Sequence, residues 1–335
     1  MSRTRDKWKK NSLYFAILSV MLLLMFFGAV NTGGIKISFS DLFRGLFFQY
    51  NREVEIIFDL RFPRIVIAML SGAALAVSGV LLQAVMKNPL SDPGIIGISA
   101  GAGFFAALVI LILPGMFFFM PLFAFVGGII ACALVYGLSW KSGLSPIRII
   151  LVGVAVNAVF SGLLKSLGYV SSGVQSSIIT SITNASIAMK TWEDAGLLKW
   201  YVLIGLVLAM LVSGRCNILS LEDKTVRNLG VNVNWTRLYV SGIAVLLASI
   251  ATAVAGSISF VGLIVPHIAR LLVGSNHRIL IPFSILSGSF TVLFADTIGR
   301  TIFYPYEIPA SIVMAVVGGP FFIYLLRRSE KIYGS

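Results

Sequence analysis

Residues 63–86 read PRIVIAMLSGAALAVSGVLLQAVM, an apolar run in which Arg64 is the only charged residue. A helix needs about 20 predominantly apolar residues to cross the hydrocarbon core of a bilayer. The run has this length, and it lacks the strict alternation of apolar and polar residues that is typical of a membrane strand. It therefore predicts a transmembrane helix.

Comparable runs recur along the whole chain. We place the other spans at about 12–30, 94–113, 117–139, 146–168, 197–215, 238–255, 257–273, 279–298 and 308–326. With 58% hydrophobic and 12% charged residues, the 335-residue chain carries too little charge to cover a soluble surface. The first run is longer than the apolar region of a signal peptide, so we interpret it as a retained span. The sequence predicts one all-α membrane domain over residues 1–335, with about ten transmembrane helices.

The distribution of basic residues predicts the orientation of the chain. Lys and Arg are more frequent in the segments predicted on the same side of the membrane as the N-terminus than in the segments predicted on the opposite side. This bias favours both termini in the cytoplasm. The chain has a net charge of +13, but its basic residues form no stripe interleaved with aromatic residues that could stack on bases. Nucleic-acid binding is therefore not expected.

Charged residues at the predicted outer surface are candidates for protein recognition. Arg61 and Arg64 flank Pro63, which suits the first turn of a helix. Arginine pairs well with carboxylates, so an acidic docking protein is one interpretation, with both arginines at the surface. The alternative is that they are interfacial residues whose charged ends reach toward water. Asp296 and Arg300 share a helix face, either as a functional pair or as a local ion pair.

The longest inner loop, residues 216–236, contains LEDKTVRNLG at 221–230. This segment reads as a short amphipathic helix closed by a glycine. Such a helix between spans can dock on a cytoplasmic partner, and the alternative is a solvated linker.

The absence of several motifs argues against some classes of protein. The chain has no GxxxxGK[ST] phosphate loop, so it is not expected to hydrolyse ATP, and no catalytic constellation indicates an enzyme. His267 and His277, the only histidines, lack carboxylates or cysteines at metal-binding spacing, so we predict roles at helix ends and no metal site. No pair of acids lies in the middle of a span, although a secondary transporter that needs no ATPase remains the alternative from another class.

Several motifs together resemble one family. They are RFPR (61–64), LLQAVMKNPLSDPGIIGISAGAG (81–103), ILVGVAVNAVFSG (150–162), GSISFVGLIVPHIARLLVGSNHR (256–278), ADTIGR (295–300) and EIPASIVMAVVGGPFFIYLLRR (307–328). The chain resembles the FecCD/BtuC-type permeases, the membrane subunits of bacterial ABC importers for iron–siderophores, haem and cobalamin. The resemblance covers nearly the whole chain.

The resemblance implies a type II ABC importer permease in the cell membrane and a set of partners. These are a second permease subunit, identical or paralogous, a cytoplasmic ATPase dimer that binds the ATP, and an extracytoplasmic solute-binding protein. By matching motifs, Arg61, Arg64 and Arg300 would receive acidic residues of the binding protein. The ATPase would engage the inner loop at Leu221, Glu222, Asp223, Arg227, Leu229 and Gly230.

The expected substrate is an iron(III)–siderophore, with haem or cobalamin as alternatives within the family. A siderophore already wraps its iron, so the permease would need no cofactor or metal ligand of its own. The Ser/Thr-rich segment 171–186 is either one lining of the substrate pathway or a plain exposed loop.

Overall fold

The computed structural model describes residues 2–32, 52–139 and 146–333, and part of the segment between the first two predicted spans lies outside these ranges. The described elements are α1 (Ser2–Asn31), α3 (Arg52–Ile56), the π-helical η1 (Ile57–Arg61), α4 (Phe62–Met86), α5 (Ile98–Ile112), the 3₁₀-helical η2 (Pro114–Phe119), α6 (Met120–Ser139), α7 (Pro146–Val170), α8 (Gly173–Asn184), α9 (Trp192–Leu211), α10 (Ser213–Leu219), α11 (Asp223–Asn228), α12 (Val233–Ala255), α13 (Val261–Val273), α14 (His277–Thr301) and α15 (Ala310–Tyr333).

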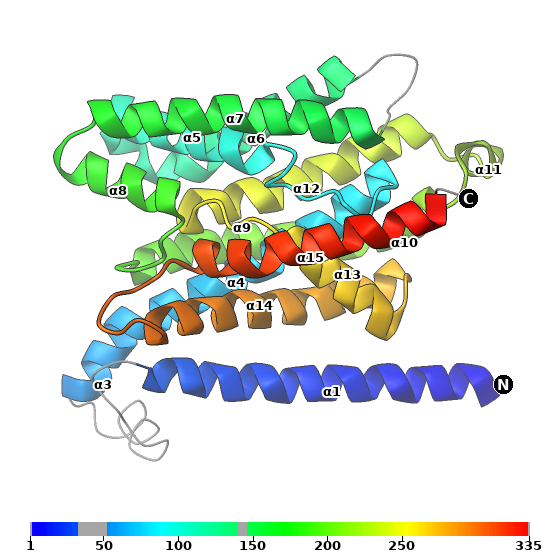
Figure 1. Ribbon diagram of the computed structural model, residues 1–335, viewed down its shortest axis with the longest axis horizontal. Helices are drawn as coiled ribbons and strands as arrows, with labels where there is room; N and C mark the ends of the chain where they lie inside the picture. Colours follow the sequence, from blue (N-terminus) through cyan, green and yellow to red (C-terminus); the bar gives the residue numbers. More distant parts are fainter. Residues whose placement is uncertain (1, 33–51, 140–145, 334–335) are drawn as a thin grey trace.

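All regular elements in these described ranges are helical, and the longer helices lie roughly along one direction (Figure 1). Seven of the helices are long and apolar enough to cross a membrane, and three shorter apolar helices cover Ile98–Ile112, Val261–Val273 and Ala310–Leu325. Each of the ten predicted spans falls on one of these ten helices. The prediction of an all-α membrane fold is therefore confirmed.

Helix α4 forms the centre of the bundle. In the most apolar stretch of 18 residues of the span that ends with α4, 83% of the residues are buried, compared with 17% in the corresponding stretch of α1. Close approach of glycines explains how the neighbouring helices pack so tightly against it. A Cβ atom on Gly72 would lie 2.2 Å from the backbone oxygen of Gly288 in α14, and one on Gly79 would lie 2.0 Å from that of Gly262 in α13. Small residues allow membrane helices to pack backbone against backbone in this way.

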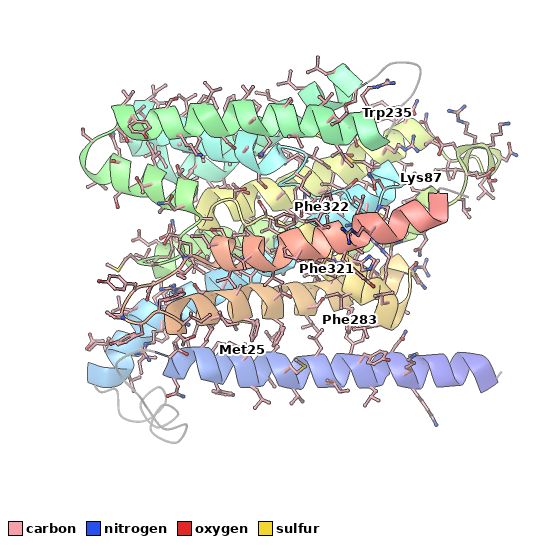
Figure 2. The ribbon with its side chains drawn as sticks, viewed as in Figure 1. Met25, Lys87, Trp235, Phe283, Phe321 and Phe322 are labelled. Carbon is pink, nitrogen blue, oxygen red and sulfur yellow. The ribbon has the colours of Figure 1, made fainter. Side chains whose placement is uncertain are left out.

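Helix α1 packs on the outside of the bundle against α14 (Figure 1). The ring of Phe15 meets Phe283 edge to face, with 5.2 Å between the ring centroids. Figure 2 shows Met25 and Phe283 in the side-chain layer between these two helices. Much of the remaining surface of α1 is exposed and apolar, as expected for a helix in contact with lipid.

Two segments differ from the sequence prediction. The second span begins near Val54 rather than at residue 63, because α3 and η1 continue directly into α4. The Ser/Thr-rich segment 171–186, for which a plain exposed loop is one of the two interpretations, contains helix α8. Thr191 and Asp194 form a capping box that begins α9 before the predicted residue 197.

The two ends of the bundle are distinct in Figure 1. Both chain termini lie at the same end as α11, and we call this the terminal end. Helices α3 and α8 lie at the opposite end, which we call the distal end. An even number of spans brings both termini to one side of a membrane, as the bias in basic residues predicts.

Candidate functional site

The predicted site residues fall into two groups, one at each end of the bundle. At the distal end, Arg64 lies in the first turn of α4 and faces Asp296 of α14. Its Nε donates to Asp296 Oδ1 and Oδ2, both at 3.1 Å, and its Nη2 donates to Oδ1 at 2.9 Å. Its Nη1 donates to Glu307 Oε2 at 2.7 Å. Arg64 therefore pairs with two acidic residues that follow it in the sequence by 232 and 243 residues.

The other two predicted arginines complete this distal cluster, which we define as Arg61, Arg64, Asp296, Arg300 and Glu307. Arg300 Nε lies 3.3 Å from Asp296 Oδ2, one turn away on the same helix. Arg61 Nη1 donates to the backbone oxygen of Val30 at 2.6 Å, and Arg300 Nη2 donates to that of Ala29 at 3.3 Å. These two hydrogen bonds connect the end of α1 to η1 and α14.

The surface position predicted for Arg64 is wrong. Its side chain is 10% exposed and that of Asp296 is 1% exposed. The reason is that η1 and α3 extend the helix outward, so Arg64 lies inside the bundle instead of at its edge. The alternative interpretation of Asp296 and Arg300 as an i, i+4 ion pair agrees with the geometry. A buried charge pair of this kind is costly to break.

A pocket of about 430 Å³ opens beside the distal cluster. It is lined by Thr32, Leu60, Arg61, Arg64, Ala188, Met189, Arg300, Tyr304, Pro305 and Glu307. The pocket brings together the three arginines that the sequence selected, and its lining includes Glu307, whose side chain is 47% exposed. An acidic group that enters the pocket would meet arginines that are already held in place.

At the terminal end, the predicted amphipathic helix is present as α11 (Asp223–Asn228). Val226 is buried, whereas Leu221 and Leu229 are exposed on either side of the helix. Gly230 follows with φ +75°, a left-handed conformation that glycine adopts without strain and that ends the helix. The predicted closure by a glycine is confirmed.

Asp223 connects α11 to two neighbouring helices. Its Oδ1 accepts from Lys87 Nζ, at the end of α4, at 2.7 Å and from Arg237 Nη2, in α12, at 3.1 Å. Lys87 Nζ also donates to the backbone oxygen of Leu221. Burial alone would raise the pKa of Asp223, but the Lys87 hydrogen bond and the charges of Arg237 and Lys87 outweigh it and lower the pKa below its ordinary value.

The histidines occupy different positions. His277 begins α14, and its backbone N–H donates to Asn217 Oδ1 at 2.8 Å, as the predicted helix-end role requires. The helix-end role predicted for His267 is wrong, because this residue lies in the middle of α13, with its ring centroid 5.7 Å from that of Phe321. In the described ranges, no group of three or more His, Cys, Asp or Glu side chains is arranged to hold a metal ion.

Lys87 and Arg237 were not selected from the sequence as partners of Asp223. The pairs are separated by 136 and 14 residues, so no helical spacing connects them. One feature of the sequence is compatible with these ion pairs: Lys87, Arg237 and Asp223 all fall in segments predicted on the same side of the membrane.

A comparison with known proteins identifies the family. The sequence profile of the FecCD transport family matches residues 21–328. The chain belongs to this family.

Curated relatives match over the full length. The probable haem-iron transport system permease protein IsdF of Staphylococcus aureus strain Newman is 41% identical over 325 residues, which cover 97% of this chain and 98% of the relative. The protein of the same name from strain MSSA476 is 40% identical over the same shares. The chain is thus a multi-pass membrane protein and a permease subunit of an ABC importer.

Two solved structures resemble the fold. One is described as an inward-facing conformation of a metal-chelate type ABC transporter, with a TM-score of 0.78, 31% identity and coverage of 95% of this chain and 99% of the other. The second, PsaBC from Streptococcus pneumoniae in complex with Fab, has a TM-score of 0.59 at 18% identity and covers 86% of this chain and 95% of the other. The latter likeness concerns the fold alone.

Proposed function

We propose that this chain is the permease subunit of an importer that carries haem-iron across the cell membrane. The observation that carries the proposal is the 41% identity to haem-iron permeases over 97% of the chain. These relatives do not support the iron(III)–siderophore predicted from the sequence, and they favour haem over cobalamin, the other alternative within the family. An iron chelate of either kind brings its own ligands, so the permease needs no metal site.

The chain would work with a second permease subunit, identical or paralogous. Helix α7 offers a surface for it, because Leu151, Val154 and Val159 are exposed apolar residues along one helix. Between α5, α7, α8 and α12 lies a small cavity of about 70 Å³, lined in part by Ser161, Thr183 and Ser257. We place the substrate pathway along this part of the bundle, with α8 as one lining element.

An extracytoplasmic binding protein would dock at the distal end. The distal cluster contains three arginines and two carboxylates, so an excess of positive charge faces the pocket. Acidic side chains of the binding protein would approach Arg61 first, because Arg61 is less buried than Arg64 and Arg300. Such exposed contacts weaken as salt is added.

A cytoplasmic ATPase dimer would engage α11 at the terminal end. Leu221 and Leu229 provide exposed apolar contacts, and Glu222 and Arg227 provide charges beside them. The ion pairs of Asp223 with Lys87 and Arg237 would transmit movement of α11 to α4 and α12. This arrangement requires both termini in the cytoplasm. ATP would bind only to the ATPase.

Uptake in a strain that lacks only this gene tests the substrate. Labelled iron is supplied either as haem or as a panel of iron(III)–siderophores. Labelled cobalamin is supplied in a separate experiment. We expect loss of haem-iron uptake alone, restored by the gene on a plasmid. Loss of siderophore or cobalamin uptake with normal haem uptake would contradict the proposal that haem is the substrate. Purification of an active transporter without any ATPase would instead support the secondary-transporter alternative.

A further inference from the structure

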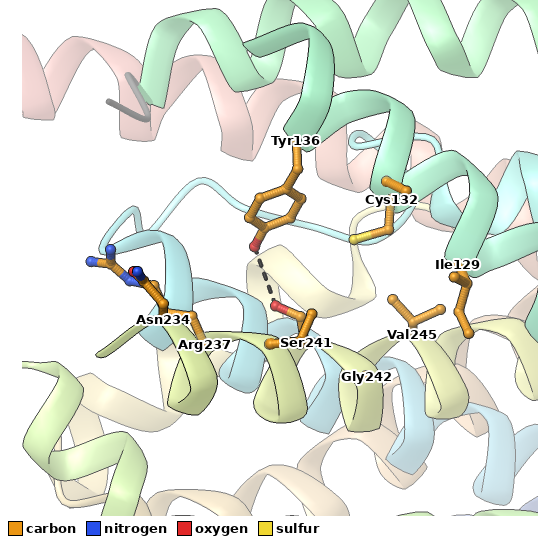
Figure 3. Close-up of a pocket in the computed structure, with 10 residues that line it drawn as sticks. Ile129, Cys132, Tyr136, Asn234, Arg237, Ser241, Gly242 and Val245 are labelled. Atoms are coloured by element: carbon orange, nitrogen blue, oxygen red, sulfur yellow. Dashed lines mark hydrogen bonds between the residues drawn. The ribbon is translucent and has the colours of Figure 1, made fainter. Parts of the chain in front are cut away.

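A groove between α6 and α12 is not explained by docking, coupling or the substrate pathway. It has a volume of about 490 Å³ and is lined by Ile129, Cys132, Ala133, Tyr136, Asn234, Arg237, Leu238, Ser241, Gly242 and Val245 (Figure 3). Small side chains at Ala133, Ser241 and Gly242 leave the space between the two helices open. The Tyr136 hydroxyl and Ser241 Oγ are 3.2 Å apart, so these two polar groups satisfy each other.

The groove is apolar along its length and polar at one end. Figure 3 places Asn234 and Arg237 at one end, and Ile129 and Val245 at the other. Residues 237 and 245 are two helical turns apart, which corresponds to about 12 Å along α12. One leaflet contributes about half of the roughly 30 Å hydrocarbon core. The groove therefore has about the depth of a single leaflet.

The polar end lies at the level expected for lipid headgroups. Arg237 is in the first turns of α12, at the terminal end of the bundle. The neighbouring Trp235 is 65% exposed at the same end (Figure 2). Tryptophan is enriched where the hydrocarbon meets the headgroups. Exposed apolar residues next to the groove, Leu134 and Leu138, are consistent with contact between this face and lipid.

Arg237 has capacity for an anionic ligand. Its Nη2 pairs with Asp223, but its buried Nε has no hydrogen-bond partner among the described residues. Asp223 is itself shared with Lys87. Two cations thus surround one carboxylate at the polar end of an apolar groove, and a phosphate would balance the second charge.

We propose that the groove between α6 and α12 binds one anionic phospholipid of the terminal-end leaflet. An acyl chain would lie between Ile129 and Val245, and the phosphate would contact Arg237 and Asn234. Because Arg237 also holds Asp223, the bound lipid would adjoin the contact between α12 and α11. The binding itself does not depend on which substrate the importer carries.

Native mass spectrometry of the purified full chain tests the proposal. The chain is incubated in detergent with palmitoyl-oleoyl phosphatidylglycerol or with the phosphatidylcholine of the same chains. We expect a preference for phosphatidylglycerol of about five-fold, the factor that about 1 kcal/mol per basic residue at an anionic surface would give. Arg237→Gln should abolish the preference, whereas Arg215→Gln, a control at an exposed arginine of α10, should retain it.

A second variant tests the groove without changing its charge. A Cβ atom on Gly242 would meet no atom within 4 Å, so Gly242→Leu can fill the groove while α12 keeps its packing. We expect this variant to lose bound lipid. Gly137 in α6 has equally open surroundings and does not line the groove, so Gly137→Leu is the matched control.

Several outcomes would overturn the proposal. Equal binding of both lipids by the unmodified chain would do so, as would undiminished lipid binding by Gly242→Leu. Displacement of the lipid by millimolar inorganic phosphate would indicate an anion site without a role for the groove. If Gly242→Leu instead prevented co-purification of another protein subunit while lipid binding was unchanged, the groove would be a protein interface.

Discussion

The distal cluster and the α11 region use the same chemical groups in opposite surroundings. At the distal end, Asp296 holds Arg64 and Arg300 inside the bundle, with the Asp296 side chain 1% exposed. At the terminal end, Asp223 holds Lys87 and Arg237 with its side chain 38% exposed. A buried carboxylate between two arginines fixes the structure, whereas an exposed one can exchange partners at low cost. The comparison predicts stability effects at one end and coupling effects at the other.

Asp296→Asn should have the largest effect on stability. It would leave the buried Arg300 without its carboxylate and Arg64 with only the half-exposed Glu307. Removing one partner of a buried charge pair costs about 3–5 kcal/mol. Thermal unfolding of the purified protein, followed by tryptophan fluorescence, would measure the loss.

Glu307→Gln is the matched control, because Glu307 also pairs with Arg64 but has a 47% exposed side chain. Its effect should be below about 1 kcal/mol. Equal destabilisation by the two variants would contradict the distinction between the buried and exposed carboxylates.

Asp223→Ala should change transport more than stability. The exposed pairs of Asp223 contribute at most about 1 kcal/mol to folding. Without them, α11 loses its ionic connections to α4 and α12, and we expect substrate uptake to fall several-fold while the unfolding temperature shifts little. Lys224→Ala provides the comparison, because Lys224 is an exposed residue of α11 that forms no ion pair among the described residues and is not a proposed ATPase contact. A large loss of stability in Asp223→Ala would remove the contrast between the two ends.

The smallest effect concerns pH. The pKa of Asp223 is lowered from 3.8, so the aspartate is more easily deprotonated in the folded state than in the unfolded state. Its contribution is therefore fully present above about pH 4 and is lost as the pH falls through the lower, folded pKa. The difference in unfolding free energy between the native chain and Asp223→Asn should stay constant from pH 8 to pH 5. A difference that shrinks within this range would argue against the assigned ion pairs.

The sequence predicts the parts of this structure that depend on local chemistry. Apolar segments become helices in a membrane because their backbone groups must be satisfied internally, so all ten spans could be found. The Asp296–Arg300 pair and the end of α11 at Gly230 follow from helical spacing and glycine conformation. The contact of Arg64 with Asp296 spans 232 residues, and only the packing of α4 against α14 creates it.

The errors also have physical causes. The predicted second span begins at residue 63, after the charged residues Glu55, Asp59 and Arg61, although the chain is already helical from Arg52 onward. Helix α8 was missed because its Ser- and Thr-rich sequence resembles a loop. The partners of Asp223 could not be predicted because they come from two other helices. The basic residues predicted on the same side of the membrane are candidate partners of Asp223, but the sequence does not show that Lys87 and Arg237 are the two that contact it.

The distance in sequence between Arg64 and Asp296 has a consequence for how the chain is made. At about 5–20 residues per second, the 232 residues that separate them take about 10–50 s to synthesise. During this time Arg64 exists without its carboxylate, and an uncompensated arginine is costly in hydrocarbon. We expect nascent chains stalled before residue 296 to keep Arg64 at the water interface, where a cysteine in its place would react with a water-soluble thiol reagent. In longer chains that include α14 the same cysteine should be protected, and the central helix would reach its final depth only after most of the bundle has been synthesised.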